Sequence, residues 1–386
     1  MLAGGVTREE LLRRLVAFDS RSQVSNRGIA DFICDCVDGP GVRIVRNESP
    51  DGAKVNVVAA RGPARDDGSG LVLSGHMDTV PFGEPEWASD PLALTCRDGR
   101  YLGRGVCDMK GFLALAVERF VATPAGLEHP LVLLLTYDEE LGTLGARRLV
   151  ETWPAGAPLP RAALIGEPTS LEVVRMHKGH LKLRVVLLGR AGHSAYPGSG
   201  RNAIEMAGGV IPALVGLGRE LEAEASPEAA AFGEVPYATL NLATISGGSA
   251  LNVIPGRCAL ELGIRLLPGM SGAGVTDRVR RAVEGAVGAG SYALEPISES
   301  PPMATPETAP IHAALCALAG QSGSRAVSFT TDGGWLGTLG LDCVVLGPGS
   351  IQAAHKPNEW LPVAEFERAA RLLEALVRDW CLARAG

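Results

Sequence analysis

The stretch LVLSGHMDTVP, residues 71–81, begins with an apolar run and ends with a histidine, an aspartate and a proline. Its first residues have the length and composition of a strand that is buried on both faces. His76 and Asp78 then stand two positions apart, just before Pro81 stops the strand. Two interpretations are open. The polar residues mark a solvated strand end, or the strand delivers a metal ligand together with the residue that supports it.

Four more apolar runs of strand length lie along the chain, and helix candidates at 111–123 and 144–153 stand between some of them. Near-continuous apolar runs that alternate with helices are typical of strands covered on both faces. The sequence therefore predicts an α/β domain with a mainly parallel central sheet. The four runs are VNVVAA (55–60), LVLLLTY (131–137), AALIGE (162–167) and CVVLGPG (343–349).

The middle of the chain has a different pattern. The run HLKLRVVLLG (180–189) alternates in polarity, as a half-exposed strand does. This run and the segments that follow it predict the order β-α-β-β-α-β, which is that of a ferredoxin-like layer. Because 386 residues are too many for one ordinary core, we expect two domains. They are a discontinuous α/β domain, 1–177 and 297–386, and an inserted α+β domain, 178–296.

The chain ends and the composition narrow the class of protein. Thr7, with Glu10 three residues later, predicts a capped first helix, and Pro362 with Glu365 predicts the start of the closing helix. A net charge of −7 without a basic stripe argues against nucleic acid and anionic membrane surfaces as partners. The chain shows no signal peptide and no apolar run of membrane-spanning length, and its eight cysteines are scattered singly. We therefore expect a cytoplasmic protein.

Histidines and carboxylates stand where the predicted strands end. In open α/β sheets the functional crevice lies outside the carboxyl ends of the strands, so five distant segments would bring such groups to one edge. Chance accounts for one or two of them, whereas five favour a metal site. The candidates are His76, Asp108 in the glycine-rich turn GRGVCDMKG, the pair Glu139 and Glu140, Glu167, and His355.

This donor set contains two histidines and three or four carboxylates. It suits borderline-to-hard divalent ions, zinc first, with cobalt or manganese as substitutes. Because it exceeds what one tetrahedral zinc needs, it predicts two ions about 3.5–4 Å apart that share a bridging carboxylate. Such a pair lowers the pKa of water and polarises a carbonyl oxygen, so hydrolysis is the expected chemistry.

Each candidate also has a structural interpretation. His76 could be a structural histidine, Asp78 a turn residue, Asp108 a helix cap, and the acidic run 138–140 a solvated charge cluster. In extended chain, however, residues two apart point the same way, so Asp78 can support the imidazole of His76. Adjacent side chains at a strand end diverge, so one glutamate can bind metal while the other acts as a general base.

Seven segments carry a resemblance to a known family. They are SGHMDTVP (74–81), GRGVCDMKG (103–111), TYDEELGTLGA (136–146), IGEPT (165–169), AGHSAYP (191–197), NVIPG (252–256) and GPGSIQAAHKPNEW (347–360). Together, and in this order, they resemble the signature of the dinuclear-zinc M20 peptidase family. The longer stretches around 165–180 and 344–362 most resemble its acetylornithine deacetylase branch. The resemblance implies a zinc exopeptidase-like catalytic domain, with the inserted domain acting as a lid and dimerisation domain.

The resemblance also implies roles for the donors. Two zinc ions would share one bridging carboxylate, and a general acid/base would stand beside them. The implied roles are His76, Glu167 and the bridging Asp108 for one zinc, Glu140, His355 and the same Asp108 for the other, Asp78 for orienting His76, and Glu139 for moving the proton.

Further residues would meet the substrate. The resemblance makes His193 the stabiliser of the tetrahedral oxyanion and Arg265 the partner of the substrate α-carboxylate. The family usually has an acidic residue two positions before this arginine, where this chain has Gly263. Asn252 would be a polar neighbour of the substrate, with a turn role as its alternative. The remaining implied contacts are Gly347 and Gly349, whose backbone would approach the ligand closely.

The resemblance implies hydrolysis of the amide bond of a small N-acyl-L-amino acid by a homodimer. N-acetyl-L-ornithine is the first expected substrate, giving L-ornithine and acetate in arginine biosynthesis. N-succinyl-diaminopimelate, N-acetylcitrulline and the broader substrates of aminoacylases or carboxypeptidases are alternatives within the family. A non-catalytic binding or dimerisation scaffold is an alternative of another class, and the intact Glu139 with its full ligand set argues against it.

Overall fold

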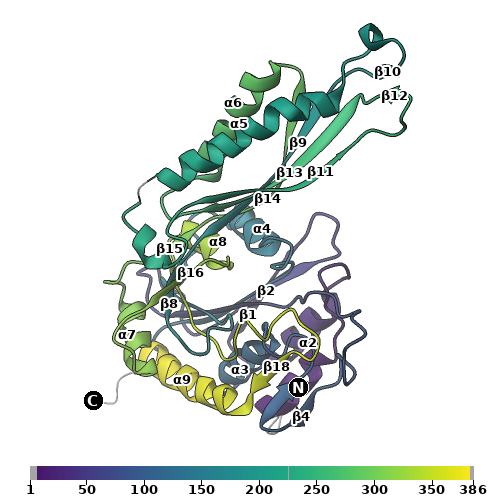
Figure 1. Cartoon of the computed structure of the whole chain (residues 1–386). Coiled ribbons are helices and arrows are strands. Elements are labelled where there is room, and N and C mark those ends of the chain that lie inside the picture. Colours follow the sequence, from purple (N-terminus) through teal and green to yellow (C-terminus); the bar gives the residue numbers. More distant parts are fainter. Residues whose placement is uncertain (1–6, 225, 383–386) are drawn as a thin grey trace. The chain divides into compact units, whose positions relative to one another are not determined.

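The computed structural model describes residues 7–224 and 226–382, and it divides into two compact units (Figure 1). The first unit is made of the chain up to Met176, Met303–Arg325 and the chain from Thr331 onward. The second unit is made of His177–Pro302 and Ala326–Thr330. It extends beyond the predicted 178–296 because its last strand continues to Ser300 and because a separate short segment joins it.

The centre of the first unit is a sheet whose four middle strands are parallel neighbours. Every residue of these strands is buried, as expected for strands that helices cover on both faces. The predicted α/β class with a mainly parallel sheet is confirmed. In sheet order the four strands are β6 (Leu131–Thr136), β3 (Leu71–His76), β7 (Ala162–Ile165) and β17 (Asp342–Val345).

Other strands flank this parallel centre. The run VNVVAA becomes β2, which pairs antiparallel with both β1 and β6. The connection between β1 and β2, residues 49–54, is too short for the crossover that a parallel pair needs. The flanking strands are β1 (Val42–Glu48) and β2 (Val55–Arg61) on one side, and β8 (Val174–His177), β15 (Met303–Ala304) and β16 (Arg325–Val327) on the other.

Helices cover both faces of this sheet. Leu71 and Leu73 of β3 face one apolar core, whereas Val72 between them faces the opposite side. The first core is completed by α1 (Arg8–Val16), α2 (Arg27–Val37), α3 (Lys110–Ala122), α7 (Pro310–Ala319) and α9 (Val363–Cys381). On the other face lie α4 (Leu144–Thr152) and α8 (Gly333–Thr338) (Figure 1). As predicted, the Thr7 side chain caps α1 by accepting a hydrogen bond from the Glu10 N–H.

A small antiparallel sheet brings two distant loops together. It contains β4 (Thr95–Arg97), β5 (Arg100–Leu102) and β18 (Trp360–Pro362). Trp360 pairs with Leu102, so the segment that follows His355 lies beside the glycine-rich turn that carries Asp108.

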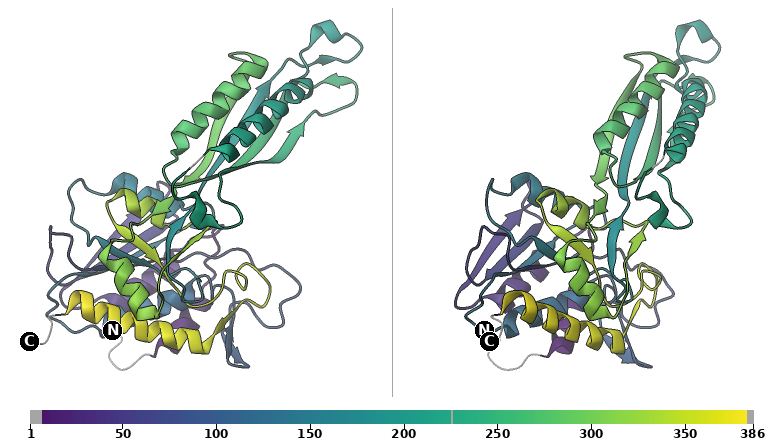
Figure 2. Two further views of the ribbon diagram at one scale, coloured as in Figure 1. Left: turned by 60° about the vertical axis from the view of Figure 1, so that its left-hand side comes forward. Right: turned by 90° about the vertical axis from the view of Figure 1, so that its left-hand side faces the viewer.

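The second unit is a four-stranded antiparallel sheet with two helices on one face (Figure 2). Its elements are β9 (Gly179–Leu188), α5 (Ala203–Ala223), β11 (Thr239–Gly247), β13 (Arg257–Leu266), α6 (Gly272–Val287) and β14 (Tyr292–Ser300), and its strand order is β11-β13-β9-β14. Along β13 buried and more exposed residues alternate, since only one face packs against the helices. This arrangement confirms the predicted ferredoxin-like layer. It also carries a two-stranded antiparallel sheet of β10 (Gly192–His193) and β12 (Val253–Ile254) and two 3-10 turns, η1 (Pro197–Ser199) and η2 (Ala229–Phe232).

Across residues 7–224 and 226–382, every helix is too short or too polar to cross a membrane.

Candidate metal centre

The predicted donor residues meet at one edge of the parallel sheet. His76 is the last residue of β3, Glu139 and Glu140 lie on the turn after β6, and Glu167 lies two residues after β7. His355 lies on the loop after β17. Because these four strands are parallel neighbours, their carboxyl ends lie side by side and bring the donors together.

Asp108 lies between the two imidazoles. Its Oδ1 is 2.9 Å from Nε2 of His76, and its Oδ2 is 3.2 Å from Nε2 of His355. Met109, rather than Asp108, occupies the N-cap position of α3. The carboxylate of Asp108 therefore faces both histidines, as a bridging ligand does.

Each imidazole also has a glutamate of its own. Oε1 of Glu140 lies 2.9 Å from Nε2 of His355, and Oε1 of Glu167 lies 3.8 Å from Nε2 of His76. One ligand atom each from His76, Asp108 and Glu140 lie within 4.8 Å of one another, and the same holds for His76, Glu139 and Glu167. The donors thus form two adjoining groups that share His76.

The titratable groups of this cluster have displaced pKa values. Burial, and then the charge of Glu167, raises the pKa of Glu139 well above its ordinary range. Burial, and then the charge of Asp108, has the same effect on the pKa of Glu167. Burial raises the pKa of Glu140 to about 7, while hydrogen bonds to Asp108 and Glu140 raise the pKa of His355 to about 10. The cluster therefore gathers more acidic groups than the two histidines can neutralise.

The chemistry of the cluster fits divalent cations. Buried carboxylates are stable in their charged form when they are paired or when they coordinate metals. Imidazole and carboxylate groups together are ligands for zinc, cobalt and manganese. A cation here would offset the charge of the carboxylates and would explain why so many of them converge on the imidazoles of His76 and His355.

Asp78 contacts both His76 and the turn that carries Glu139 and Glu140. The Nδ1 atom of His76 lies 3.0 Å from the backbone carbonyl oxygen of Asp78 and 3.5 Å from its carboxylate. The same carboxylate accepts hydrogen bonds from the backbone N–H groups of Glu139 and Glu140 and from the hydroxyl of Ser22. Asp78 is fully buried, so its role extends from the imidazole to the turn that carries both glutamates.

The sequence analysis did not predict two buried residues beside the cluster, Asp332 and Lys54. Oδ2 of Asp332 accepts a hydrogen bond from the Thr136 hydroxyl at the end of β6, and burial raises the pKa of Asp332 to about 6. Lys54 forms a 2.6 Å ion pair with Asp138, the first residue of the acidic run. The apolar context of Lys54, beside the strand VNVVAA, was the one available sequence signal for its burial.

Glu359 is a third residue that the sequence analysis did not single out. Its side chain is 1% exposed and accepts hydrogen bonds from the loop that carries Asp108. Its position four residues after His355, in the quoted segment GPGSIQAAHKPNEW, was the available signal.

Most of the chain matches a known family. Residues 72–379 match the profile described as peptidase family M20/M25/M40. This chain belongs to that family. It is an M20-family metallohydrolase, and the predicted family resemblance is confirmed.

Individual M20 relatives are similar over nearly their full length. An acetylornithine deacetylase of Proteus mirabilis (strain HI4320) is 34% identical over 386 residues, which cover 97% of each chain. An M20 family metallo-carboxypeptidase from Sulfolobus solfataricus has a similar fold, with a TM-score of 0.75 at 17% identity over 97% of this chain and 99% of that one. A Bacillus subtilis protein described as a dinuclear metal binding peptidase from the M20 family has a similar fold, with a TM-score of 0.62 at 15% identity. The match covers 96% of this chain and 98% of that one.

In the second unit of this M20 chain, His193 lies in the two-stranded sheet of β10 and β12, and Asn252 lies directly before β12. His193 pairs with Val253 across β10 and β12, and the Asn252 carbonyl accepts a hydrogen bond from the Ser194 N–H. Both His193 and Asn252 are exposed. The pairing of these two segments thus holds the two predicted substrate contacts next to each other.

Arg265 lies near the end of β13. Its Nη1 donates a 2.9 Å hydrogen bond to the hydroxyl of Thr330, and burial lowers its pKa. A Cβ placed at Gly263 would lie 3.4 Å from Nε2 of His180. Where the family usually has an acidic residue, this chain therefore has the imidazole of His180 close by.

The two glycines of the loop after β17 make close contacts within the protein. A Cβ at Gly347 would lie 2.2 Å from the carbonyl oxygen of Gly166 and 2.5 Å from that of Glu167. Gly349 has a φ of +89°, and a Cβ there would lie 2.5 Å from Sγ of Cys107. Their predicted contact with the ligand stays a prediction.

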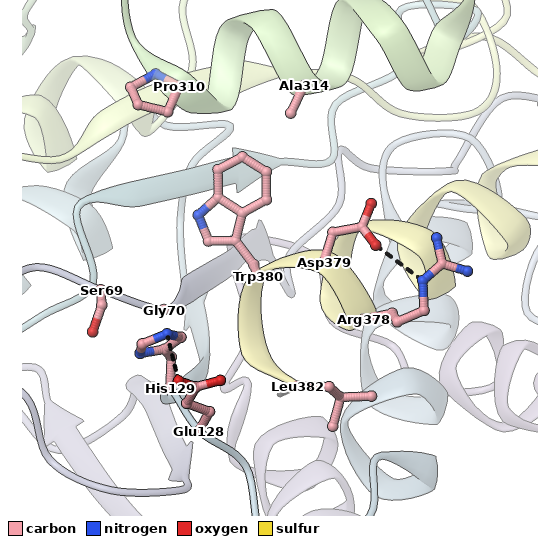
Figure 3. A pocket seen from close by; sticks show the side chains of 10 residues that line it. All are labelled: Ser69, Gly70, Glu128, His129, Pro310, Ala314, Arg378, Asp379, Trp380 and Leu382. Carbon is pink, nitrogen blue, oxygen red and sulfur yellow. Dashed lines mark hydrogen bonds and ion pairs between the residues drawn. The ribbon is translucent and has the colours of Figure 1, made fainter. Parts of the chain in front are cut away.

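A cavity of about 1400 Å³ lies at the opposite edge of the sheet (Figure 3). Gly70 and His129 on its wall stand just before β3 and β6, at the amino ends of these strands. Trp380 of α9 projects into it below Pro310 and Ala314 of α7. Its lining shares no residue with the donor cluster.

Proposed function

We propose that this chain is a two-metal amidohydrolase that removes the acyl group from a small N-acyl-L-amino acid, first of all N-acetyl-L-ornithine. One observation carries the proposal: the Asp108 carboxylate faces both His76 and His355, and each imidazole has a glutamate beside it. This is the arrangement that two cations with one shared carboxylate require.

The donors divide into two sets. His76, Glu167 and Asp108 would hold one ion, and His355, Glu140 and Asp108 would hold the other. Zinc is the first choice for two imidazoles with carboxylates, and cobalt or manganese would substitute. When bound, such ions lower the pKa of water and polarise a substrate carbonyl.

Glu139 moves the proton. It lies on the same turn as Glu140 but in the group with His76 and Glu167, so the two adjacent glutamates have different neighbours. A buried carboxylate with a raised pKa takes a proton readily and gives it back, as a general acid/base must. It would remove the proton from the attacking water and pass it to the leaving nitrogen. The C–N bond of the amide breaks, a C–O bond forms, and the products are a carboxylate and an amine.

The second unit supplies candidate contacts for the rest of the substrate. Arg265 presents a planar guanidinium that suits two-point binding of an α-carboxylate. His193 would donate to the oxygen on which charge develops, and Asn252 on the paired segment would add a polar contact. We propose a homodimer formed through this unit, which would also act as a lid.

A similar relative supports the choice of substrate, and the cysteines support the choice of compartment. The 34% identical relative from Proteus mirabilis bears the name acetylornithine deacetylase, and the similarity covers 97% of both chains. N-acetylcitrulline, N-succinyl-diaminopimelate and general N-acyl amino acids or peptides are the alternatives within the family. All eight cysteines are among the described residues and each is free, which suits a reducing, cytoplasmic compartment.

A substrate panel with metal control tests the proposal. The purified protein is stripped with a chelator, reloaded with Zn²⁺ or Co²⁺, and assayed on N-acetyl-L-ornithine, N-acetyl-L-citrulline, N-succinyl-diaminopimelate and N-acetyl-L-methionine. We expect metal-dependent release of acetate, fastest from N-acetyl-L-ornithine. Preference for the succinylated substrate would overturn the substrate assignment. Full turnover in the chelated protein would overturn the metal mechanism, and no turnover with any substrate would favour the scaffold alternative.

A further inference from the structure

The carboxylate of Glu359 has all of its acceptor positions occupied by one loop. Oε1 accepts hydrogen bonds from the backbone N–H groups of Cys107 at 2.8 Å and Asp108 at 3.1 Å. Oε2 accepts from the Gly105 N–H at 2.9 Å and from Nη1 of Arg104 at 3.0 Å. Glu359 and Arg104 are each 1% exposed, so these bonds form away from solvent.

The position of Glu359 links the loops that carry two of the donors. It lies four residues after His355 and directly before β18, while its four hydrogen-bond donors lie between β5 and Asp108. β5 and β18 pair antiparallel, and the Gly103 N–H also donates to the backbone carbonyl of Glu359. The carboxylate therefore connects the segment that carries His355 to the backbone of Asp108.

We propose that Glu359 is the positioning residue that sets the distance and orientation of Asp108 relative to His355, and so the geometry of the metal ion that these two residues share. The inference rests on the proposed two-metal site. A bridging carboxylate works only if its two oxygens stay oriented toward the two metal positions. The backbone N–H of Asp108 donates a hydrogen bond to the carboxylate of Glu359, which holds this residue in place. Residues that orient a ligand in this way commonly change metal affinity about 10–100-fold when they are replaced.

A carboxylate is the group that this position requires. Glutamine has one acceptor oxygen and one NH₂ donor in place of two acceptor oxygens. In either orientation of a glutamine side chain, its NH₂ would face two N–H donors. Glu359→Gln therefore leaves two buried donors of the loop without an acceptor, and the loop must shift to satisfy them.

Glu84 offers a matched control. Its Oε1 lies 3.4 Å from Nη2 of the same Arg104, so it is a second carboxylate partner of that guanidinium. In the described part of the chain, the Glu84 side chain bonds Arg104 and Trp87 but not the amides of residues 105–108, and it is 35% exposed. Glu84→Gln thus removes one negative charge beside Arg104, while the Asp108 loop stays hydrogen-bonded to Glu359.

The experiment is a Co²⁺ titration of chelator-stripped protein, read by visible absorption and by the number of ions bound per chain. We expect wild type and Glu84→Gln to bind two ions with the same spectrum. We expect Glu359→Gln to bind one of the two ions about 10–100-fold more weakly, with an altered absorption band. Its kcat should fall while its KM for the substrate stays near the wild-type value, because the substrate contacts lie elsewhere.

The outcomes separate this inference from the proposed function. Two ions bound by folded Glu359→Gln with wild-type affinity and spectrum would overturn the positioning role, while the two-metal site would stand. A wild-type protein that takes up fewer than two Co²⁺ ions would overturn the proposed site, and this inference with it. If far-UV circular dichroism shows that Glu359→Gln does not fold, Glu359→Asp is titrated in its place. That side chain keeps the charge but is one methylene shorter, and the same criteria apply.

Discussion

The carboxylate of Asp78 accepts a 3.1 Å hydrogen bond from the backbone N–H of Glu139. Its other oxygen accepts from the Glu140 N–H at 3.3 Å and from the Ser22 hydroxyl at 2.8 Å. Since Asp78 also lies beside the imidazole of His76, one buried side chain fixes a proposed metal ligand and the turn that holds the proposed base. Second-layer contacts of this kind set the orientation of metal ligands.

Replacing Asp78 should therefore damage metal binding and turnover together. We expect Asp78→Ala to weaken metal affinity about 10–100-fold. Turnover should fall further than metal loading explains, because the Glu139 turn also loses its anchor. Isothermal titration with Zn²⁺ and steady-state kinetics at saturating metal measure the two effects. Ser22→Ala removes one of the same hydrogen bonds and is the control, with a smaller loss expected. Wild-type kinetics of Asp78→Ala at saturating metal would contradict the role in the turn.

Replacing Glu139 should remove chemistry and spare metal binding. Glu139→Gln keeps the size of the side chain but cannot accept the proton, so we expect kcat to fall by about 10²–10⁴-fold. Metal content by elemental analysis should stay at the wild-type level. Glu151 is exposed and lies in α4, the helix that follows this turn. Glu151→Gln therefore serves as a control, and we expect its kinetics to be unchanged. A lost ion in Glu139→Gln would instead make Glu139 a metal ligand.

Gly347 should be intolerant of even a methyl group. A Cβ there would lie 2.2 Å from the Gly166 carbonyl oxygen, so Gly347→Ala must push the Glu167 segment away. We expect a loss of about 1–3 kcal/mol in the free energy of unfolding, the usual cost of overpacking, together with weaker metal binding. Gly337→Ala is the control, because a Cβ at that position has open space among the described residues. Urea unfolding and metal titration of both variants check the prediction.

The second unit should lose stability in mild acid through His177. Burial lowers the pKa of this imidazole to about 4, below its ordinary value of 6.5. As the pH falls below 6.5, the unfolded chain takes up the proton before the folded chain does, so stability is lost down to about pH 4. Between pH 7.5 and pH 5 this amounts to about 2 kcal/mol.

The same prediction is measured as a double difference. The free energy of unfolding of wild type and His177→Gln is determined by urea at both pH values, with the same metal concentration. We expect the acid-induced loss to be smaller in His177→Gln, since glutamine does not titrate. Equal acid-induced losses in the two proteins would show that His177 binds protons equally in the folded and the unfolded chain, which contradicts the lowered pKa in the folded state.

Arg265 should act on substrate affinity. Lysine keeps the charge but lacks the planar fork, so Arg265→Lys should raise KM for N-acetyl-L-ornithine about tenfold or more, with a smaller effect on kcat. Arg184→Lys, on a neighbouring strand and paired with Glu261, should leave both constants unchanged. An unchanged KM for Arg265→Lys would remove this residue from the substrate site.

Much of the site was predictable because it depends on a repeated local pattern. All donors except Asp108 follow an apolar run that only a buried strand accommodates, and the carboxyl ends of parallel strands meet at one edge. His76 and Glu167 follow this rule directly. Asp332 and Glu359 do not, because each is an acidic residue in a polar loop whose burial depends on partners far away in the chain, Thr136 and the loop of Asp108.

The sequence by itself determined the two-domain α/β and ferredoxin-like architecture, the donors and their order. Apolar periodicity is a local property that constrains the architecture, and residue type is a local property that identifies the candidate donors. Tertiary structure alone decided how the donors are held. In the folded chain the Asp78 carboxylate accepts a hydrogen bond from the backbone N–H of Glu139, and the Glu359 carboxylate accepts one from the backbone N–H of Asp108. Backbone N–H groups are the same in every residue, so only the folded chain reveals which carboxylate they bind.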